Sequence, residues 1–309
     1  MTASKCSSLT GKPYGIERVC RVWGYPRSTF YLNRQPREIN QFKPGKRGPK
    51  PKLSDEQILK LIREDLANSP FIGEGHRKVW ARLKFGKGIR VGRNRVQRLM
   101  RENNLLSPRR ARRDANPHQG EIITAAPDQM WGADGTKVFT VKEGWAWLFA
   151  AVDHFNAECV GYHICKKGDR FNALEPISQG VKEHFGFLSQ DSARGLRLRI
   201  DSGSQYVSEH FQNQIKFWGI SASFAFIEQP QTNGVIERFF RTLKEQIIYG
   251  RVYETIEDLK VAVDKFVKLY NQEWRIERLG FLSPKQAREN YLTGLAKCAS
   301  LLERMKKCA

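Results

Sequence analysis

Residues 131–152, WGADGTKVFTVKEGWAWLFAAV, contain two runs of strand-favouring residues separated by a Lys-Glu-Gly turn. Valine, phenylalanine, threonine and tryptophan favour extended backbone, so we predict a β-hairpin with strands at residues 137–141 and 145–152. Asp134 lies at the head of this hairpin. A carboxylate in that place reaches the edge of a sheet, which makes Asp134 a candidate site residue.

Two further acidic residues lie in comparable contexts. The alternating run at residues 196–200 predicts a strand that ends at Asp201, where Asp-Ser-Gly opens a turn. Glu237 follows Gln231-Thr-Asn-Gly234 and lies near the start of a predicted helix. The apolar residues that recur at helical spacing there are Ile236, Phe240, Leu243 and Ile247. Two strand ends and one helix start therefore bring Asp134, Asp201 and Glu237 to one edge of a sheet.

Carboxylates gathered in this way are ligands for hard divalent cations. Mg²⁺ takes oxygen ligands, keeps several waters and uses only one or two protein carboxylates. Two such ions about 3.5–4 Å apart activate an attacking oxygen and stabilise the leaving oxygen at phosphorus. We therefore predict phosphodiester chemistry with two Mg²⁺ ions per site, for which Mn²⁺ substitutes.

Each acid also has an ordinary interpretation, because a single aspartate at a strand end is usually a turn residue or a helix cap. The three contexts together favour a site. Asp153, in Val152-Asp-His-Phe155, is the main competitor as first metal ligand. Its place before Asn156-Ala-Glu158 suits a solvated hairpin turn better, so Asp134 is preferred.

The chain resembles transposases of the DDE class, in the insertion-sequence group whose catalytic core is similar to that of retroviral integrases. The matching motifs are Trp131-x-x-Asp134-x-Thr136, Asp201-x-Gly-Ser-x-Tyr206, and Asn233-Gly-x-x-Glu237-Arg-Phe with Thr242-Leu-Lys244, with 35 residues between Asp201 and Glu237. The resemblance covers residues 70–290. It implies an α/β, ribonuclease-H-like core with a mixed sheet flanked by helices, which cleaves and joins DNA at transposon ends. It departs at Arg275-Ile-Glu277, where relatives often carry Arg-Pro-His, so no histidine role transfers to that segment.

The positive charge of the chain is concentrated before the core. The net charge is +21, and residues 1–125 hold 28 Lys and Arg against 10 Asp and Glu, so +18 of the excess lies there. Neutralising phosphates releases counterions, so such a segment favours a polyanion. We predict double-stranded DNA as the partner, and the resemblance implies that this DNA includes transposon terminal inverted repeats and target DNA.

A helix-turn-helix DNA-binding domain is predicted over residues 53–106. Ser54-Asp-Glu-Gln57 forms a capping box that opens a helix to Asn68, and further helices are expected at residues 75–84 and 92–101. The last of these suits a recognition helix in a major groove, with a structural amphipathic helix as the alternative. The DNA-contacting residues predicted in this helix are Arg93, Arg95, Gln97, Arg98 and Arg101. Arg241 and Lys244, which lie at i+4 and i+7 from Glu237, are predicted to contact DNA beside the site.

The rest of the chain divides by composition. Residues 1–40 form a small helical segment, a possible helix-turn-helix, while residues 41–52 and 107–126 are basic linkers. The catalytic core spans residues 127–250, and residues 251–309 are helices that dock on it. The cysteines lack metal-ligand spacing and the first 75 residues contain no histidine, so no zinc site is expected. With neither a signal peptide nor an apolar run long enough for a bilayer, we expect a cytoplasmic, DNA-associated protein that contacts no membrane.

The combined prediction is a metal-dependent transposase or integrase. Two rival functions stay open, a non-catalytic DNA-binding regulator and a nuclease of the same fold that only hydrolyses. Joining two ends requires two duplexes to be held at once, so a homo-oligomer on DNA is expected.

Overall fold

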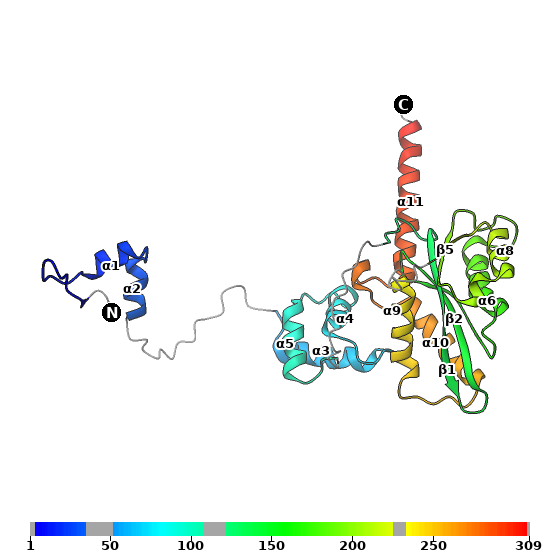
Figure 1. Cartoon of the computed structure of the whole chain (residues 1–309), viewed down its shortest axis with the longest axis horizontal. Helices are drawn as coiled ribbons and strands as arrows, with labels where there is room; N and C mark the ends of the chain where they lie inside the picture. Colours follow the sequence, from blue (N-terminus) through cyan, green and yellow to red (C-terminus); the bar gives the residue numbers. More distant parts are fainter. Residues whose placement is uncertain (1–3, 35–51, 108–121, 225–232, 308–309) are drawn as a thin grey trace. The chain divides into compact units, whose positions relative to one another are not determined.

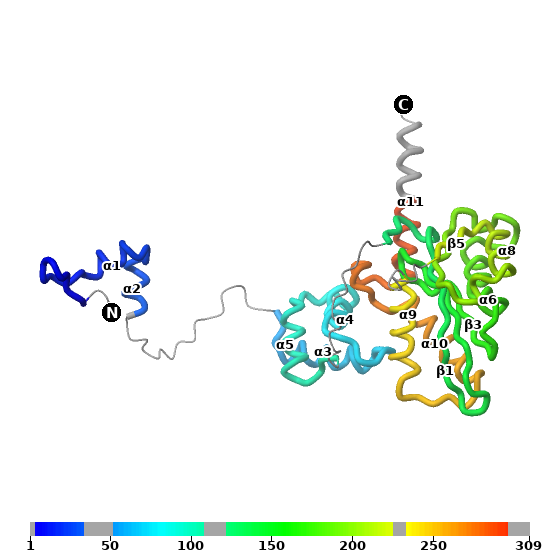
Figure 2. Tube along the Cα trace, in the orientation of Figure 1, coloured from blue at the N-terminus to red at the C-terminus, as the bar shows by residue number. Residues whose placement is uncertain are grey.

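The computed structural model describes residues 4–34, 52–107, 122–224 and 233–307 and divides into two compact units between Lys52 and Leu53 (Figure 1). Figure 2 marks the same ranges along the Cα trace. The predicted linkers at residues 41–52 and 107–126 lie mostly outside the described residues. Among the described helices, none has both the length and the apolar content that crossing a membrane requires.

The first unit contains two short helices, α1 (Ile16–Val22) and α2 (Arg27–Arg34), within the segment predicted to be helical at residues 1–40. Gly24 separates them with a positive φ of 61°, a backbone conformation that suits glycine. Cys20 is buried between them, whereas Val22 and Trp23 are exposed.

Residues 53–107 form a three-helix module at the start of the second unit. Its helices are α3 (Asp55–Asn68), α4 (His76–Ala81), continued by the π-helix η2 (Arg82–Gly86), and α5 (Arg93–Glu102). The predicted capping box is confirmed, because Ser54 Oγ accepts from the Gln57 N–H and Gln57 Oε1 accepts from the Ser54 N–H. The apolar residues that the three helices bury against one another are Ile58, Ile62, Val79, Leu83, Val96, Leu99 and Met100.

The rest of the second unit is built on a five-stranded sheet with strand order β3-β2-β1-β4-β5. The strands are β1 (Met130–Thr140), β2 (Gly144–Asp153), β3 (Cys159–Cys165), β4 (Arg197–Ile200) and β5 (Ser221–Phe224). β1, β2 and β3 pair antiparallel, whereas β4 pairs in parallel with β1 and with β5. The predicted hairpin is confirmed, but its first strand begins at Met130, so Asp134 lies inside the strand. Residues 130–132 pair with β4, a long-range contact that local sequence does not reveal, and from Trp131 onward the strand also pairs with β2.

Helices cover both faces of this sheet (Figure 1). α6 (Arg170–Phe185) and α8 (Glu209–Phe217), which follows the short α7 (Ser204–Val207), pack with Trp131 and Ala133 of β1. α9 (Gly234–Leu243) and α10 (Ile256–Glu273) pack with Val138 on the opposite face. This mixed sheet with helices on both faces is the ribonuclease-H-like α/β fold that the sequence predicted.

The C-terminal helices belong to the same core. The buried residues of α10, namely Leu259, Val263, Phe266, Val267 and Tyr270, share an apolar cluster with α9 and the sheet. The π-helix η4 (Lys244–Ile248) extends α9, and the 3₁₀ helix η5 (Glu277–Leu279) precedes α11 (Pro284–Lys307).

Candidate active site

Asp134 and Asp201 are placed at the same level of two neighbouring strands. β1 and β4 pair in parallel, with Gly132 opposite Arg199. Continuing that register by two residues along each strand brings Asp201, directly after β4, level with Asp134. The predicted proximity of these two carboxylates therefore has a basis in the strand pairing.

Strand alternation sets the face on which Asp134 lies. Successive residues of a strand point to opposite faces of the sheet. Ala133 belongs to the apolar cluster under α6, whereas Val138 belongs to the cluster under α9. Asp134 shares the parity of Val138 and therefore lies on the α9 face, where its side chain is partly buried.

Glu237 lies in the first turn of α9, which packs on β1 and β2. Its side chain is exposed, while Ile236 and Phe240 are buried beneath the helix, as predicted. Just before the helix, Asn233 Nδ2 donates to the carbonyl oxygen of Ala133 at 3.3 Å. This bond ties the start of the glutamate-bearing helix to the residue that precedes Asp134.

The three acids interact through their charges. Burial is the main cause that raises the pKa of Asp134 to about 6, and the negative charges of Asp201 and Glu237 raise it further. A hydrogen bond from the Gly135 N–H and the positive charge of Lys244 act in the opposite direction. The charges of Asp201, Glu237 and Lys244 therefore all act on the Asp134 carboxyl group.

The three carboxylates do not form a preformed metal-binding site. Within the described part of the chain, no group of three or more His, Cys, Asp or Glu side chains is placed to hold a metal ion. Within the same residues, no lysine or arginine forms an ion pair with Asp134, Asp201 or Glu237. The acids thus repel one another without an ion-paired cation, and oxygen donors in that state suit a hard divalent ion.

Beside the triad, the two predicted DNA-contacting residues, Arg241 of α9 and Lys244 of η4, differ in their surroundings. Lys244 is near enough to lower the pKa of Asp134. Arg241 lies in the last turn of α9 with an exposed side chain. Both positions are open to a bound phosphate backbone, which remains a prediction.

In the three-helix module, several of the predicted DNA-contacting arginines already have acidic partners. Arg95 donates to Asp55 and to the Leu53 carbonyl, and Arg98 pairs with Asp55 and Glu102. These two side chains do point away from the apolar face of α5, as expected, but DNA has to compete for them.

The other predicted contacts on α5 are less engaged. Arg93 lies 3.7 Å from Glu277 of the core. Gln97 is partly buried, and Arg101 is exposed in the last turn. The groove-reading role of all five residues on α5 stays a prediction.

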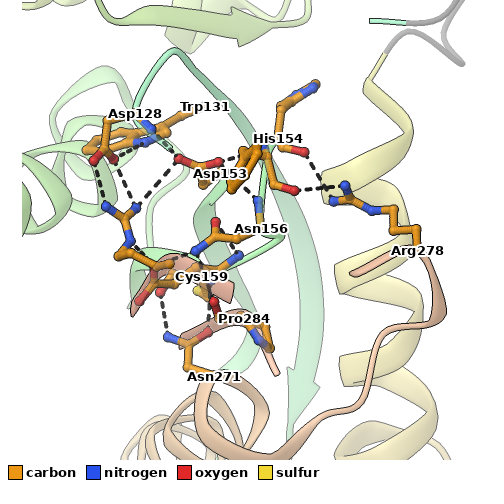
Figure 3. A network of polar contacts seen from close by, with 12 residues as sticks. Asp128, Trp131, Asp153, His154, Asn156, Cys159, Asn271, Arg278 and Pro284 are labelled. Atoms are coloured by element: carbon orange, nitrogen blue, oxygen red, sulfur yellow. Dashed lines mark hydrogen bonds and ion pairs between the residues drawn. The ribbon is translucent and has the colours of Figure 1, made fainter. Parts of the chain in front are cut away.

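Asp153, the competing first ligand, occupies a different environment from the one the sequence suggested. It does lie at a turn, but its side chain is fully buried, so the expectation of a solvated turn is wrong. Its carboxylate accepts from the N–H groups of Asp128 at 2.7 Å and Phe155 at 2.6 Å (Figure 3). Burial is the main cause that raises the pKa of Asp153 to about 6.

Arg288 of α11 completes this second acidic cluster, in which Asp128, Asp153 and Glu158 surround one guanidinium. The Arg288–Asp128 and Arg288–Glu158 ion pairs measure 2.6 and 2.5 Å, and the Arg288–Asp153 pair measures 3.6 Å. The turn-like sequence around Asp153 does not indicate that its side chain is buried, because the arginine that covers it comes from a helix far along the chain. No local signal around Asp153 reveals that partner.

Two other residues near the triad carry features that sequence reasoning missed. Tyr206, a motif position without an assigned role, is buried, and burial raises its pKa well above its usual value. The charges of Asp134 and Asp201 add to that shift, which places Tyr206 close to both. His154 is buried at the end of β2, and a Cβ atom on Gly132 would meet both the His154 ring and Asn233 Oδ1. The position of His154 in the Asp-His-Phe run did not indicate that its side chain is buried.

Comparison with known families matches almost the whole second unit. An HTH-like domain matches residues 53–113, and integrase core domain models match residues 124–230 and 219–284, which together span more than half of the chain. The transposase for insertion sequence element IS629 of Shigella sonnei is 26% identical over 91% of this chain and 94% of its own length. The putative transposase InsK for IS150 of Escherichia coli K12 is 26% identical over 89% of this chain and 94% of its own. Among solved structures, the catalytic core domain of BIV integrase aligns with 56% of this chain and 99% of its own, at 20% identity and a TM-score of 0.39.

Proposed function

The chain belongs to the insertion-sequence transposases of the DDE class, and from that membership we propose that it cleaves transposon ends and joins them to target DNA at Asp134, Asp201 and Glu237. The observations that support the assignment are the strand register that brings Asp201 level with Asp134 and the packing of α9, whose first turn carries Glu237, on β1 and β2. Asp134 lies on the sheet face under α9, and its pKa responds to both Asp201 and Glu237.

The donor set fits Mg²⁺, with Mn²⁺ as its substitute. Asp134 and Asp201 would hold the ions jointly, and Glu237 would complete the site. When bound, two such ions activate the attacking oxygen and stabilise the leaving oxygen of an in-line displacement at phosphorus. Cations would also relieve the repulsion that now contributes to the raised pKa of Asp134.

The reaction would proceed in two displacements without a covalent protein intermediate. Water attacks the phosphodiester at a transposon end, and the P–O3′ bond breaks to leave a free 3′-hydroxyl. That hydroxyl then attacks a target phosphodiester, so one P–O bond forms as another breaks. Lys244 and Arg241 would hold the DNA backbone beside the carboxylates, because both lie on the helix that carries Glu237.

The three-helix module would bind the terminal repeats and the core would bind the scissile phosphates. DNA phosphates would displace Asp55 and Glu102 from Arg95 and Arg98, which are partly solvent-accessible. Replacing a base-reading arginine by alanine should cost about 1–3 kcal/mol at a specific site. One chain offers one triad and one such module, so paired ends would require at least two chains assembled on DNA.

A strand-transfer assay tests the proposal and separates its rivals. End-labelled duplex carrying the terminal repeat is incubated with the whole protein in Mg²⁺ or Mn²⁺, and both nicked and joined products are measured. A transposase yields both, a hydrolytic nuclease yields nicks alone, and a DNA-binding regulator yields neither. Retained cleavage by Glu237→Gln would exclude the assigned triad.

A further inference from the structure

The three-helix module is attached to the catalytic helix itself. The Gln246 side chain of η4 bonds Ile72 in both directions, since its Oε1 accepts from the Ile72 N–H and its Nε2 donates to the Ile72 carbonyl, each at 2.8 Å. η4 continues α9, whose first turn carries Glu237. An α-helix rises 1.5 Å per residue, so the nine steps from Glu237 to Gln246 span about 13 Å.

An apolar contact reinforces this attachment. The Phe71 ring lies edge-on to Trp274 with ring centroids 4.8 Å apart, and the amino group of Lys78 lies over the Trp274 ring. Phe71 is buried in the apolar cluster of the sheet, α9 and α10, not in that of its own module. The module is therefore partly embedded in the catalytic core.

Glu277 of η5 adds a charged contact between the core and the module. Its carboxylate pairs with Arg77 of α4 at 2.6 Å and lies 3.7 Å from Arg93 of α5. Exposed ion pairs of this kind contribute little by themselves. Together with Gln246 and Trp274, however, they fix the start of α5 relative to α9.

We propose that Gln246, Trp274 and Glu277 are positioning residues that set the distance along DNA between the sequence bound by the three-helix module and the phosphate that is cut. This inference rests on the proposed function. Successive nucleotides of one strand advance by about 3.4 Å along the duplex, so a shift of that size in the module would move the cut by one nucleotide. A joint fixed by two hydrogen bonds, an edge-to-face pair of a buried and a partly buried ring, and an ion pair resists such a shift.

The experiment maps the cut to single-nucleotide resolution on an end-labelled duplex. The variant combines Gln246→Ala with Glu277→Ala, which removes the hydrogen bonds and the ion pairs and leaves Phe71 and Trp274 packed. Its matched control combines Gln214→Ala with Glu209→Ala on α8. Circular dichroism and thermal unfolding verify that both proteins fold.

The wild type and the control should cut at one phosphate, whereas the variant should cut at several neighbouring phosphates with DNA affinity within about two-fold of wild type. Trp274→Ala should broaden the cut in the same way, and Trp274→Phe, which keeps a ring against Phe71, should restore a single position. If the variant cuts only at the wild-type phosphate, whether fast or slowly, the inference is wrong.

Hydroxyl-radical footprinting separates this inference from the proposed function, because it requires no cleavage. The wild type should protect the recognised sequence and the flanking junction in one register. The variant should keep the first protection and lose the second. An unchanged footprint rejects the positioning role, whereas a wild type that protects DNA but never cuts it rejects the proposed activity instead.

Discussion

Two groups of three carboxylates lie in the same core, and they differ in what neutralises them. Asp128, Asp153 and Glu158 surround Arg288, which the chain supplies from α11. The charge of Lys244 acts on Asp134, but among the described residues no basic side chain forms an ion pair with Asp134, Asp201 or Glu237. Asp134 and Asp153 both have a pKa raised to about 6, chiefly by burial. A perturbed carboxylate therefore marks function only when its partners are considered too.

The largest expected difference between the two groups is in activity. Asp134→Asn should lower end cleavage and joining by roughly 10³-fold or more, because it removes a carboxylate that acts directly on the reacting phosphate. Asp153→Asn, the same isosteric change in the other group, should leave cleavage within a few-fold. Gel assays with matched protein concentrations measure both, and an Asp153→Asn variant as inactive as Asp134→Asn would reverse our ranking of the two aspartates.

Stability should respond in the opposite order. Arg288→Met leaves three acids without their shared cation, so the free energy of unfolding should fall by about 3–5 kcal/mol. Lys285→Met, an exposed position one turn earlier in α11, is the control and should change it by less than about 0.5 kcal/mol. Urea titration followed by circular dichroism measures the change. Equal free energies of unfolding for the two variants would show that the ion pairs of Arg288 with Asp128, Asp153 and Glu158 do not stabilise the fold.

His154, which follows Asp153, should make the stability of the protein depend on pH. Burial, followed by the charges of Arg278 and Arg199, lowers the pKa of His154 to about 4. The unfolded chain binds this proton below about pH 6.5, whereas the native protein withholds it until about pH 4, so stability falls as pH drops through that window. The loss should reach about 3 kcal/mol. His154→Gln should flatten the urea-midpoint profile between pH 6.5 and 4, and a variant that keeps the wild-type slope would contradict this origin.

The smallest expected effect distinguishes the groups by their response to added metal. An ion that binds only the native state at ten times its dissociation constant should stabilise the protein by about 1.4 kcal/mol. Mg²⁺ should therefore raise the wild-type melting temperature, and Asp201→Asn should abolish the rise while Asp153→Asn retains it. Isothermal titration calorimetry provides a second measurement. If Mg²⁺ fails to raise the melting temperature of Asp153→Asn but still raises that of Asp201→Asn, the ion binds at Asp128, Asp153 and Glu158 and not at the proposed site.

Local patterns predicted most of the elements, and the limits of prediction are physical. The capping box at Ser54, the hairpin after Asp134 and the buried face of α9 each leave a pattern among residues close together in the sequence, and all three are present. The pairing of the start of β1 with β4 joins segments more than 60 residues apart and leaves no such pattern. The solvent-free state of Asp153 depends on Arg288 in the same way.

The candidate site shows the same division. The three acids could be selected from their sequence motifs, although Asp134 lies inside β1 and not at the head of the strand. The ion pairs of Arg95 and Arg98 with Asp55 could not, because Asp55 lies about forty residues upstream on another helix. The attachment of Ile72 to Gln246 spans 174 positions and left no sign in either segment.

The Arg288 group also orders events during protein synthesis. Asp128 and Arg288 are 160 positions apart, and chains are made N-terminus first at about 5–20 residues per second, so roughly 10–30 s separate the two. The internal contacts of the three-helix module, by contrast, close within residues 53–107. A nascent chain therefore completes its helical module well before Arg288 can neutralise the acids of the core. The four-residue group around Arg288 is therefore completed later in synthesis than the three-helix module.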